Sequence, residues 1–276
     1  MSRIREAFAN GKAFIPFITA GYPDLETTGK ILRAAQEAGA DLIEIGIPFS
    51  DPTAEGPVIQ TANVAALEGG VTTDRVFEFV EEMRRSGAVT VPMVFMTYAN
   101  VVYSYHEGGD GASDGSDGTD RGKYGFCRRC AEVGIDGLIL PDVPFEEKDE
   151  FTDACRQNGL DLVSLIAPTS EDRIRKIAQD AEGFLYIVSS LGVTGVRSAI
   201  TTDIGAITRR IREVTDVPCA VGFGISTPQQ AAEMAAQSDG AIVGSAIIRI
   251  IDRFGKDAAP EVGAYVRSMK EALRAL

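Results

Sequence analysis

The chain has 276 residues, of which 45% are hydrophobic, and 40 acids against 27 bases give it a formal net charge of -13. A field of this sign repels phosphate backbones and argues against nucleic-acid binding, and no apolar run approaches the roughly 20 residues that cross a membrane. No leader-like segment opens the sequence, so we expect a cytoplasmic protein with protein or small-molecule partners. The bases are mostly arginine, and such acid-rich, lysine-poor surfaces resemble those of salt-loving organisms.

Eight apolar runs of strand length follow one another along the chain, separated by segments with helical period such as 25–39 and 146–159. The runs begin at Phe14, Asp41, Pro92, Gly137, Asp161, Gly183, Cys219 and Gly240. Near-continuous apolar strands that alternate with helices are typical of parallel strands covered on the outside. The pattern predicts an α/β protein with one domain over residues 1–276, a (β/α)8 TIM barrel with an extra helix at each end.

In the second run, DLIEIGIP, an acid stands among apolar residues. Strand alternation puts Leu42, Glu44 and Gly46 on one face and the isoleucines on the other, so Glu44 is predicted to point into the barrel near its mouth. None of the eight runs contains a lysine or arginine, which weakens the alternative of a buried ion pair. A desolvated carboxyl has a raised pKa and can exchange protons near neutral pH. Tyr186 alternates onto the inner side of the sixth run and is either a neighbour of Glu44 or a core tyrosine.

Residues 108–122, GGDGASDGSDGTDRG, interrupt the rhythm after the third run. They contain too little apolar surface to offset their ordering entropy, so we expect a flexible insertion there. Their aspartates are compatible with calcium, but neither the EF-hand spacing nor a nonapeptide repeat is present. Cys127 and Cys130 form a lone CxxC without a second pair or nearby histidines, so we predict reduced thiols and no metal.

Glycine-rich segments follow the last three runs: SSLGVTG at 189–195, GFGIS at 222–226 and GSAII at 244–248. Glycine lets backbone N–H groups approach an anion closely, and a short helix that starts after Gly244 would add its positive end. Many barrels bind phosphate after these strands. Together the three segments predict a phosphate site.

The segments PFITAGYPD, IEIGIPFSDPTAEGPVIQ, MTYAN, PDVPFEE, LGVTG, GFGIS and GSAII occur in one order across nearly the whole chain. In these segments the sequence resembles the tryptophan synthase alpha chain family. The resemblance implies a lyase that cleaves indole-3-glycerol phosphate to indole and glyceraldehyde 3-phosphate, without metal or organic cofactor. It also implies a beta-chain partner in an α2β2 complex, where pyridoxal phosphate belongs to the partner.

The resemblance implies specific roles for residues of this chain. Glu44 matches the acid that transfers protons, Tyr186 a tyrosine beside it, and Glu55 the carboxylate that holds the indole N–H. At Glu55 the sequence departs from the family, which usually has aspartate there. The positions that match phosphate-binding residues are Gly195, Gly224, Gly244 and Ser245, and those that match the indole pocket and its supports are Phe17, Thr97, Tyr98, Asp142 and Ile225.

The resemblance also places the partner surface and a lid. Contacts with the beta chain are implied for 48–57 and for the segment after Asn100, so we hypothesise that the insertion borders the partner. The glycine-rich loop 192–195 matches a lid over the substrate.

One alternative is a non-catalytic subunit that binds and activates a beta chain. Another is a different phosphate-binding barrel, such as an indole-glycerol-phosphate synthase or a sugar-phosphate epimerase; the synthase would be expected to have catalytic lysines at strand ends, and the runs have none.

Overall fold

Eight parallel strands close into a barrel in the order of the sequence, with the last strand paired to the first. The computed structural model describes residues 2–106, 122–189, 202–222 and 224–276. The strands are β1 Ala13–Thr19, β2 Ile43–Gly46, β3 Met93–Met96, β4 Gly137–Ile139, β5 Asp161–Ile166, β6 Leu185–Val188, β7 Cys219–Gly222 and β8 Gly240–Val243. Each lies within one of the eight predicted runs or extends it by a single residue. The predicted TIM barrel is confirmed.

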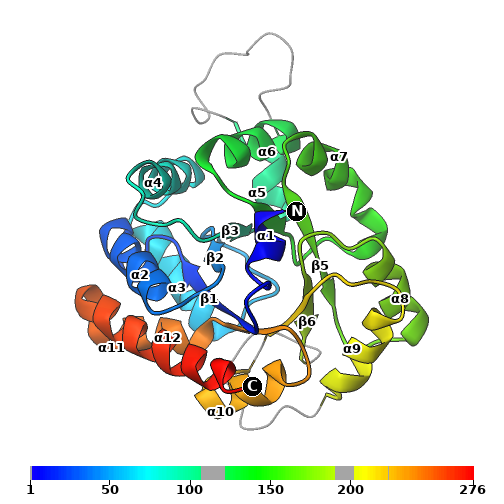
Figure 1. Cartoon of the computed structure of the whole chain (residues 1–276). Coiled ribbons are helices and arrows are strands. Elements are labelled where there is room, and N and C mark those ends of the chain that lie inside the picture. Colours follow the sequence, from blue (N-terminus) through cyan, green and yellow to red (C-terminus); the bar gives the residue numbers. More distant parts are fainter. Residues whose placement is uncertain (1, 107–121, 190–201, 223) are drawn as a thin grey trace.

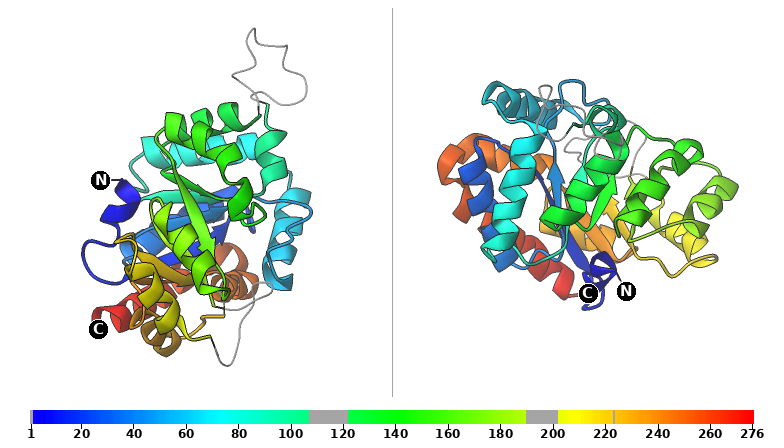
Figure 2. Two further views of the ribbon diagram at one scale, coloured as in Figure 1. Left: turned by 90° about the vertical axis from the view of Figure 1, so that its right-hand side faces the viewer. Right: turned by 90° about the horizontal axis from the view of Figure 1, so that it is seen from above.

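Helices surround the barrel, as Figures 1 and 2 show. They are α1 Arg3–Glu6, α2 Leu25–Glu37, α3 Pro57–Glu68, α4 Thr73–Arg85, α5 Ala99–Tyr103, α6 Gly122–Val133, α7 Asp149–Gln157, α8 Glu171–Gln179, α9 Ile204–Arg212, α10 Pro228–Ala235, α11 Ser245–Phe254 and α12 Ala258–Arg274, with single 3-10 turns at Phe145–Glu147 and Gly255–Asp257. Because helices cover the outer face and side chains fill the inside, nearly every strand residue is buried.

The strands are shorter than the apolar runs that predicted them. The second run extends over 41–48, but β2 covers only Ile43–Gly46, since the chain leaves the sheet before Pro48, which has no N–H to donate. The other described residues of the runs lie at either end of the strands, and the last run continues into α11 from Ser245. The register aligns Glu44 with Phe17 on β1 and with Val94 on β3, so all three lie at one height in the barrel wall.

The predicted N-terminal helix is present, but it is only four residues long. α1 ends at Glu6, and the next residues continue as tighter turns in which Ala7 and Phe8 donate to the carbonyls three residues earlier. The turns end at Gly11, whose φ of 108° is a left-handed value that favours glycine. Ile4 of α1 is fully buried, so this short helix still covers part of the barrel's amino end.

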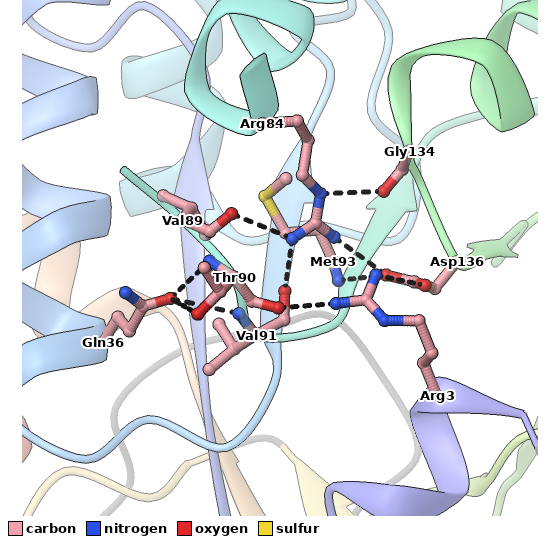
Figure 3. A network of polar contacts seen from close by, with 9 residues as sticks. All are labelled: Arg3, Gln36, Arg84, Val89, Thr90, Val91, Met93, Gly134 and Asp136. Atoms are coloured by element: carbon pink, nitrogen blue, oxygen red, sulfur yellow. Dashed lines mark hydrogen bonds and ion pairs between the residues drawn. The ribbon is translucent and has the colours of Figure 1, made fainter. Parts of the chain in front are cut away.

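A partly buried arginine, Arg84, connects α4 with the chain after α6 and, through Asp136, with α1, as Figure 3 shows. Arg84 donates to the carbonyls of Gly134, Val89 and Val91, and its guanidinium lies 2.9 Å from Asp136. Arg3 of α1 pairs with the other oxygen of Asp136. This network fixes the start of β3 and β4 at the end of the barrel opposite to their carboxyl-terminal loops.

The predicted C-terminal helix is α12, which packs against α2 and α10. Its Lys270 is buried and donates to Asp41 at 2.6 Å and to the carbonyl of Lys12 at 2.8 Å.

The predicted insertion, 108–122, lies outside the described residues except for Gly122. Gly122 donates its N–H to the carbonyl of Tyr105 at 2.8 Å, so the two flanks of the insertion meet. None of the described helices is long and apolar enough to cross a membrane.

Candidate active site

Glu44 lies on β2 with only 1% of its surface exposed, as the alternation of the strand predicted. One carboxylate oxygen, Oε2, is buried and has no hydrogen-bond partner among the described residues. Burial, and secondarily the charge of Glu55, raise the pKa of Glu44 to about 8. No lysine or arginine contributes to this shift, so the alternative of a buried ion pair finds no support in the described part of the chain. At neutral pH Glu44 is mostly protonated and can donate a proton.

Glu55 follows β2 in a loop and is also buried, with 3% of its surface exposed. Its Oε2 accepts a hydrogen bond of 2.6 Å from Nδ2 of Asn63 on α3. Burial raises the pKa of Glu55 to about 7, and the hydrogen bond from Asn63 acts in the opposite direction because it favours the charged form. The two carboxyls, eleven residues apart in sequence, therefore line one site with raised pKa values.

Tyr186 stands on β6 across the barrel and lines the same cavity as both carboxyls. Burial raises the pKa of its hydroxyl far above the ordinary value, with smaller contributions from Glu44 and Glu55. Gly222 on β7 makes room for it, since a Cβ at Gly222 would lie 2.4 Å from the Tyr186 hydroxyl oxygen. The tyrosine is thus a protonated neighbour of the two acids.

The cavity opens at the carboxyl ends of the strands, where barrels of this type place their chemistry. Its walls combine the two acids with apolar side chains and with glycines of the loops after β7 and β8. The lining residues are Phe17, Glu44, Glu55, Ile59, Met96, Tyr186, Gly224, Ile225, Ile242, Gly244 and Ser245. Phe17 reaches into it beside Gly46, where a Cβ would lie 2.6 Å from the phenyl ring. Eight of the twelve predicted site residues therefore meet in one place.

Three predicted residues lie outside this lining. The Tyr98 ring packs on Phe49 with centroids 5.1 Å apart, and its hydroxyl accepts the N–H of Ala54 at 3.2 Å. Asp142 accepts the N–H of Ala99 with both oxygens, at 3.1 and 3.2 Å. Thr97 is fully buried. Tyr98 and Asp142 therefore hold loops at the mouth of the site. The fourth, Gly195, and the predicted lid lie outside the described residues.

The glycines on the far wall of the cavity provide an anion-binding arrangement. α11 begins at Ser245 after Gly244, which confirms the predicted helix. The N–H groups of Ser245 and Ala246 have no acceptor within the helix, while those of Ile247 and Ile248 donate to the carbonyl of Gly244. Such an N-terminus favours negative charge. Gly224 has a φ of 82°, a value that favours glycine. Among the described residues no lysine or arginine lines the cavity, so in this part of the chain an anion would be held by backbone N–H groups and the hydroxyl of Ser245.

A second cavity of about 490 Å³ lies beside the first, between the ends of β4 to β6 and the helices α7 and α8. Its walls are mostly apolar, and its two cations are already paired. Lys148 donates to Asp180 at 3.0 Å, and Arg173 binds Glu146 with both guanidinium nitrogens. This cavity therefore lacks a free cation among its lining residues and is less suited to phosphate than the glycine-rich wall.

All four cysteines are free and buried. Cys127 and Cys130 lie on α6, and the Cys127 sulfur is 3.8 Å from that of Cys155 on α7, too far for a disulfide. Over the described residues, no group of three histidine, cysteine or acidic side chains is arranged to hold a metal ion.

The sequence reading missed Asn63, Ile59, Met96 and Ile242. The last three are apolar residues on α3, β3 and β8, and no sequence pattern distinguishes their contact with the cavity from ordinary core packing. Asn63 carries a weak signal, because an amide within a mostly apolar helix needs a polar partner if it is buried.

Comparisons with known proteins identify the family of the chain. Residues 4–274 match the family model described as tryptophan synthase alpha chain. The alpha chain of Lacticaseibacillus casei is 42% identical, with 100% of this chain and 97% of the relative aligned, and that of Lactiplantibacillus plantarum is 44% identical over 99% and 97%. The solved alpha subunit from Legionella pneumophila superposes with a TM-score of 0.85 at 35% identity and full coverage of both chains. A Mycobacterium tuberculosis tryptophan synthase structure superposes with a TM-score of 0.83 at 32% sequence identity, covering 99% of this chain and 98% of that chain. The chain belongs to the tryptophan synthase alpha chain family.

Proposed function

We propose that Glu44 transfers the protons of the reaction of this family, the cleavage of indole-3-glycerol phosphate to indole and glyceraldehyde 3-phosphate. The observation that carries the proposal is the burial of Glu44 without a cation, in a cavity that it shares with a second acid and with anion-binding glycines. Glu55 is the proposed acceptor of the indole N–H. The enzyme is a lyase that needs no cofactor of its own.

In the proposed step, the carboxyl of Glu44 both donates and accepts a proton. Protonated Glu44 gives its proton to indole C3, which places a positive charge on the ring nitrogen next to the Glu55 carboxylate. The resulting Glu44 carboxylate then takes the proton of the hydroxyl on the glycerol carbon attached to the ring. The carbon–carbon bond breaks, its electrons return to the ring, and the products are indole and an aldehyde. Glu44 ends protonated, ready for another cycle.

For the phosphate, we propose the backbone at Gly224 and Gly244 and the hydroxyl of Ser245, with Gly195 added on the family resemblance. In this proposal the phosphate group binds at the glycine-rich wall while the indole end of the substrate faces the two acids. Phe17 and Ile225 supply apolar contact surface for the indole ring, and Tyr186 limits the space beside Glu44.

Members of this family work with a beta chain, and pyridoxal phosphate belongs to that partner. We propose an α2β2 assembly in the cytoplasm, one barrel domain for this chain, and a partner surface that includes the loop 48–57 and the flank of the 108–122 insertion. A deletion of 109–121 tests the last point. Unchanged beta-chain affinity and unchanged mutual activation in high salt would rule it out.

The alternative is a chain that only binds and activates a beta chain, which the glutamate at 55 leaves open. One assay separates the two functions. Indole release from indole-3-glycerol phosphate by the purified chain, rising when the beta chain is added, supports the lyase. A chain that raises beta-chain turnover but releases no indole at any concentration supports the alternative.

A further inference from the structure

The loop that carries Glu55 is already held to α3 by its backbone. Gln60 Nε2 donates to the carbonyl of Glu55 at 2.7 Å, its N–H donates to the carbonyl of Gly56 at 3.0 Å, and the N–H of Glu55 donates to the carbonyl of Pro52 at 3.2 Å. These bonds fix the path of the main chain. They leave the side chain of Glu55 free to rotate, so the orientation of the carboxylate needs a separate cause.

Asn63 supplies that cause. It lies on the second turn of α3 with 2% of its surface exposed, and its Nδ2 donates to Glu55 Oε2 at 2.6 Å. The bond reaches the carboxylate itself and not the loop backbone. A buried amide at a helix position where an apolar residue would pack equally well is costly unless its hydrogen bond is made, so the pair is mutually dependent.

The length of the Glu55 side chain makes its orientation depend on this hydrogen bond. Glutamate has one more methylene than aspartate, and therefore one more rotatable bond to fix. A hydrogen bond to one oxygen restrains that bond and leaves the other oxygen for a ligand. The loop backbone, held by Gln60, does not have to move to make the contact.

We infer that Asn63 is a positioning residue that holds the Glu55 carboxylate in place for the indole N–H. This inference rests on the proposed function of Glu55. Asn63 itself does not line the cavity, so it acts through Glu55.

The ionisation of Glu55 reports this role directly. The titratable groups whose charges interact with it are Glu44 from β2, Tyr98 before α5 and Tyr186 from β6. None is a base, so in the described structure the Asn63 bond is the contact that favours the charged form. Loss of the bond is expected to raise the pKa of Glu55.

The first experiment compares Asn63→Ala with Thr61→Ala, an exposed position on the same helix. In the complex with the beta chain, Asn63→Ala is expected to lower kcat for indole release about tenfold, the value of one hydrogen bond to a charged group. The KM is expected to change less than threefold, because the phosphate wall is intact. The acidic limb of the kcat profile should move to higher pH, and Thr61→Ala should leave all three quantities unchanged.

The second experiment moves the methylene. Glu55→Asp shortens one partner and is expected to lose the bond, while Glu55→Asp with Asn63→Gln restores the combined length. The double variant should release indole at least threefold faster than Glu55→Asp alone. A purely structural role for Asn63 predicts a lower melting temperature in Asn63→Ala, with no shift of the pH limb and no recovery in the double variant; that result overturns the inference.

Carbon-13 NMR of the Glu55 carboxyl, assigned with Glu55→Gln, separates this inference from the proposed function. If the wild-type chain releases no indole, the proposed function fails, but the titration still decides the role of Asn63. A higher Glu55 pKa in Asn63→Ala supports it. An unchanged pKa overturns it, whether or not the wild type is active.

Discussion

Replacement of Glu44 by glutamine should change how the stability of the protein depends on pH. Burial raises the pKa of Glu44 from 4.5 to about 8. At about 1.4 kcal/mol per pH unit, this shift corresponds to about 5 kcal/mol. The unfolded chain loses this proton near pH 4.5 and the native protein near pH 8, so between these values the native state binds more protons. The free energy of unfolding therefore falls as the pH rises through this window.

Glutamine has nearly the same shape but no proton to lose in this range. Relative to Glu44→Gln, the wild-type protein should lose about 5 kcal/mol of stability between pH 4.5 and 8. Urea unfolding followed by circular dichroism at half-unit steps of pH measures the difference. Glu55 is present in both proteins, and the exposed Glu261→Gln serves as a control that should parallel the wild type. If the two free energies differ by a constant, within about 1 kcal/mol, the burial of Glu44 does not control its ionisation.

Three further outcomes are expected. Arg84→Ala leaves Asp136 with less compensation at the amino end of the barrel and should lower the free energy of unfolding by about 3 kcal/mol in urea, while a loss below 1 kcal/mol would show that the network in Figure 3 is not stabilising. Gly222→Ala forces the Tyr186 side chain to move and should reduce the rate of indole release at least about tenfold. The control Gly205→Ala, where a Cβ meets only the ends of flexible side chains, should not reduce it, and equal rates for the two variants would contradict the tight fit of Tyr186 against Gly222. All four cysteine thiols are buried, so a thiol reagent should label them only after unfolding, and mass spectrometry showing rapid labelling of the native protein would contradict this.

The barrel could be predicted from the sequence because its strands are buried on both faces. Such strands appear as continuous apolar runs, and their number and alternation with helices leave few possible topologies. The ends of the elements could not be predicted equally well. α1 is only four residues long, and the chain continues as tighter turns before Gly11, which the helical pattern of the sequence does not distinguish from helix.

The central acid could also be predicted, since a charge in an apolar strand has only two faces to choose between. Glu44 lies on the inner one. Asn63 could not be predicted as a partner of Glu55, because its contact depends on how the loop turns back onto α3. Tyr98 and Asp142 matched pocket residues by motif alone, and in the structure they hold the loops around the pocket.

The most direct test of the proposed function is single-turnover indole release by Glu44→Gln in the complex with the beta chain. The proposal predicts a rate at least about 1,000-fold below wild type, because the carboxyl supplies both proton transfers, with glycerol 3-phosphate affinity unchanged within about twofold. Glu44→Asp should recover a measurable part of the rate. A Glu44→Gln rate within tenfold of wild type, with the same phosphate affinity, would contradict the assignment of Glu44 as the proton-transferring group.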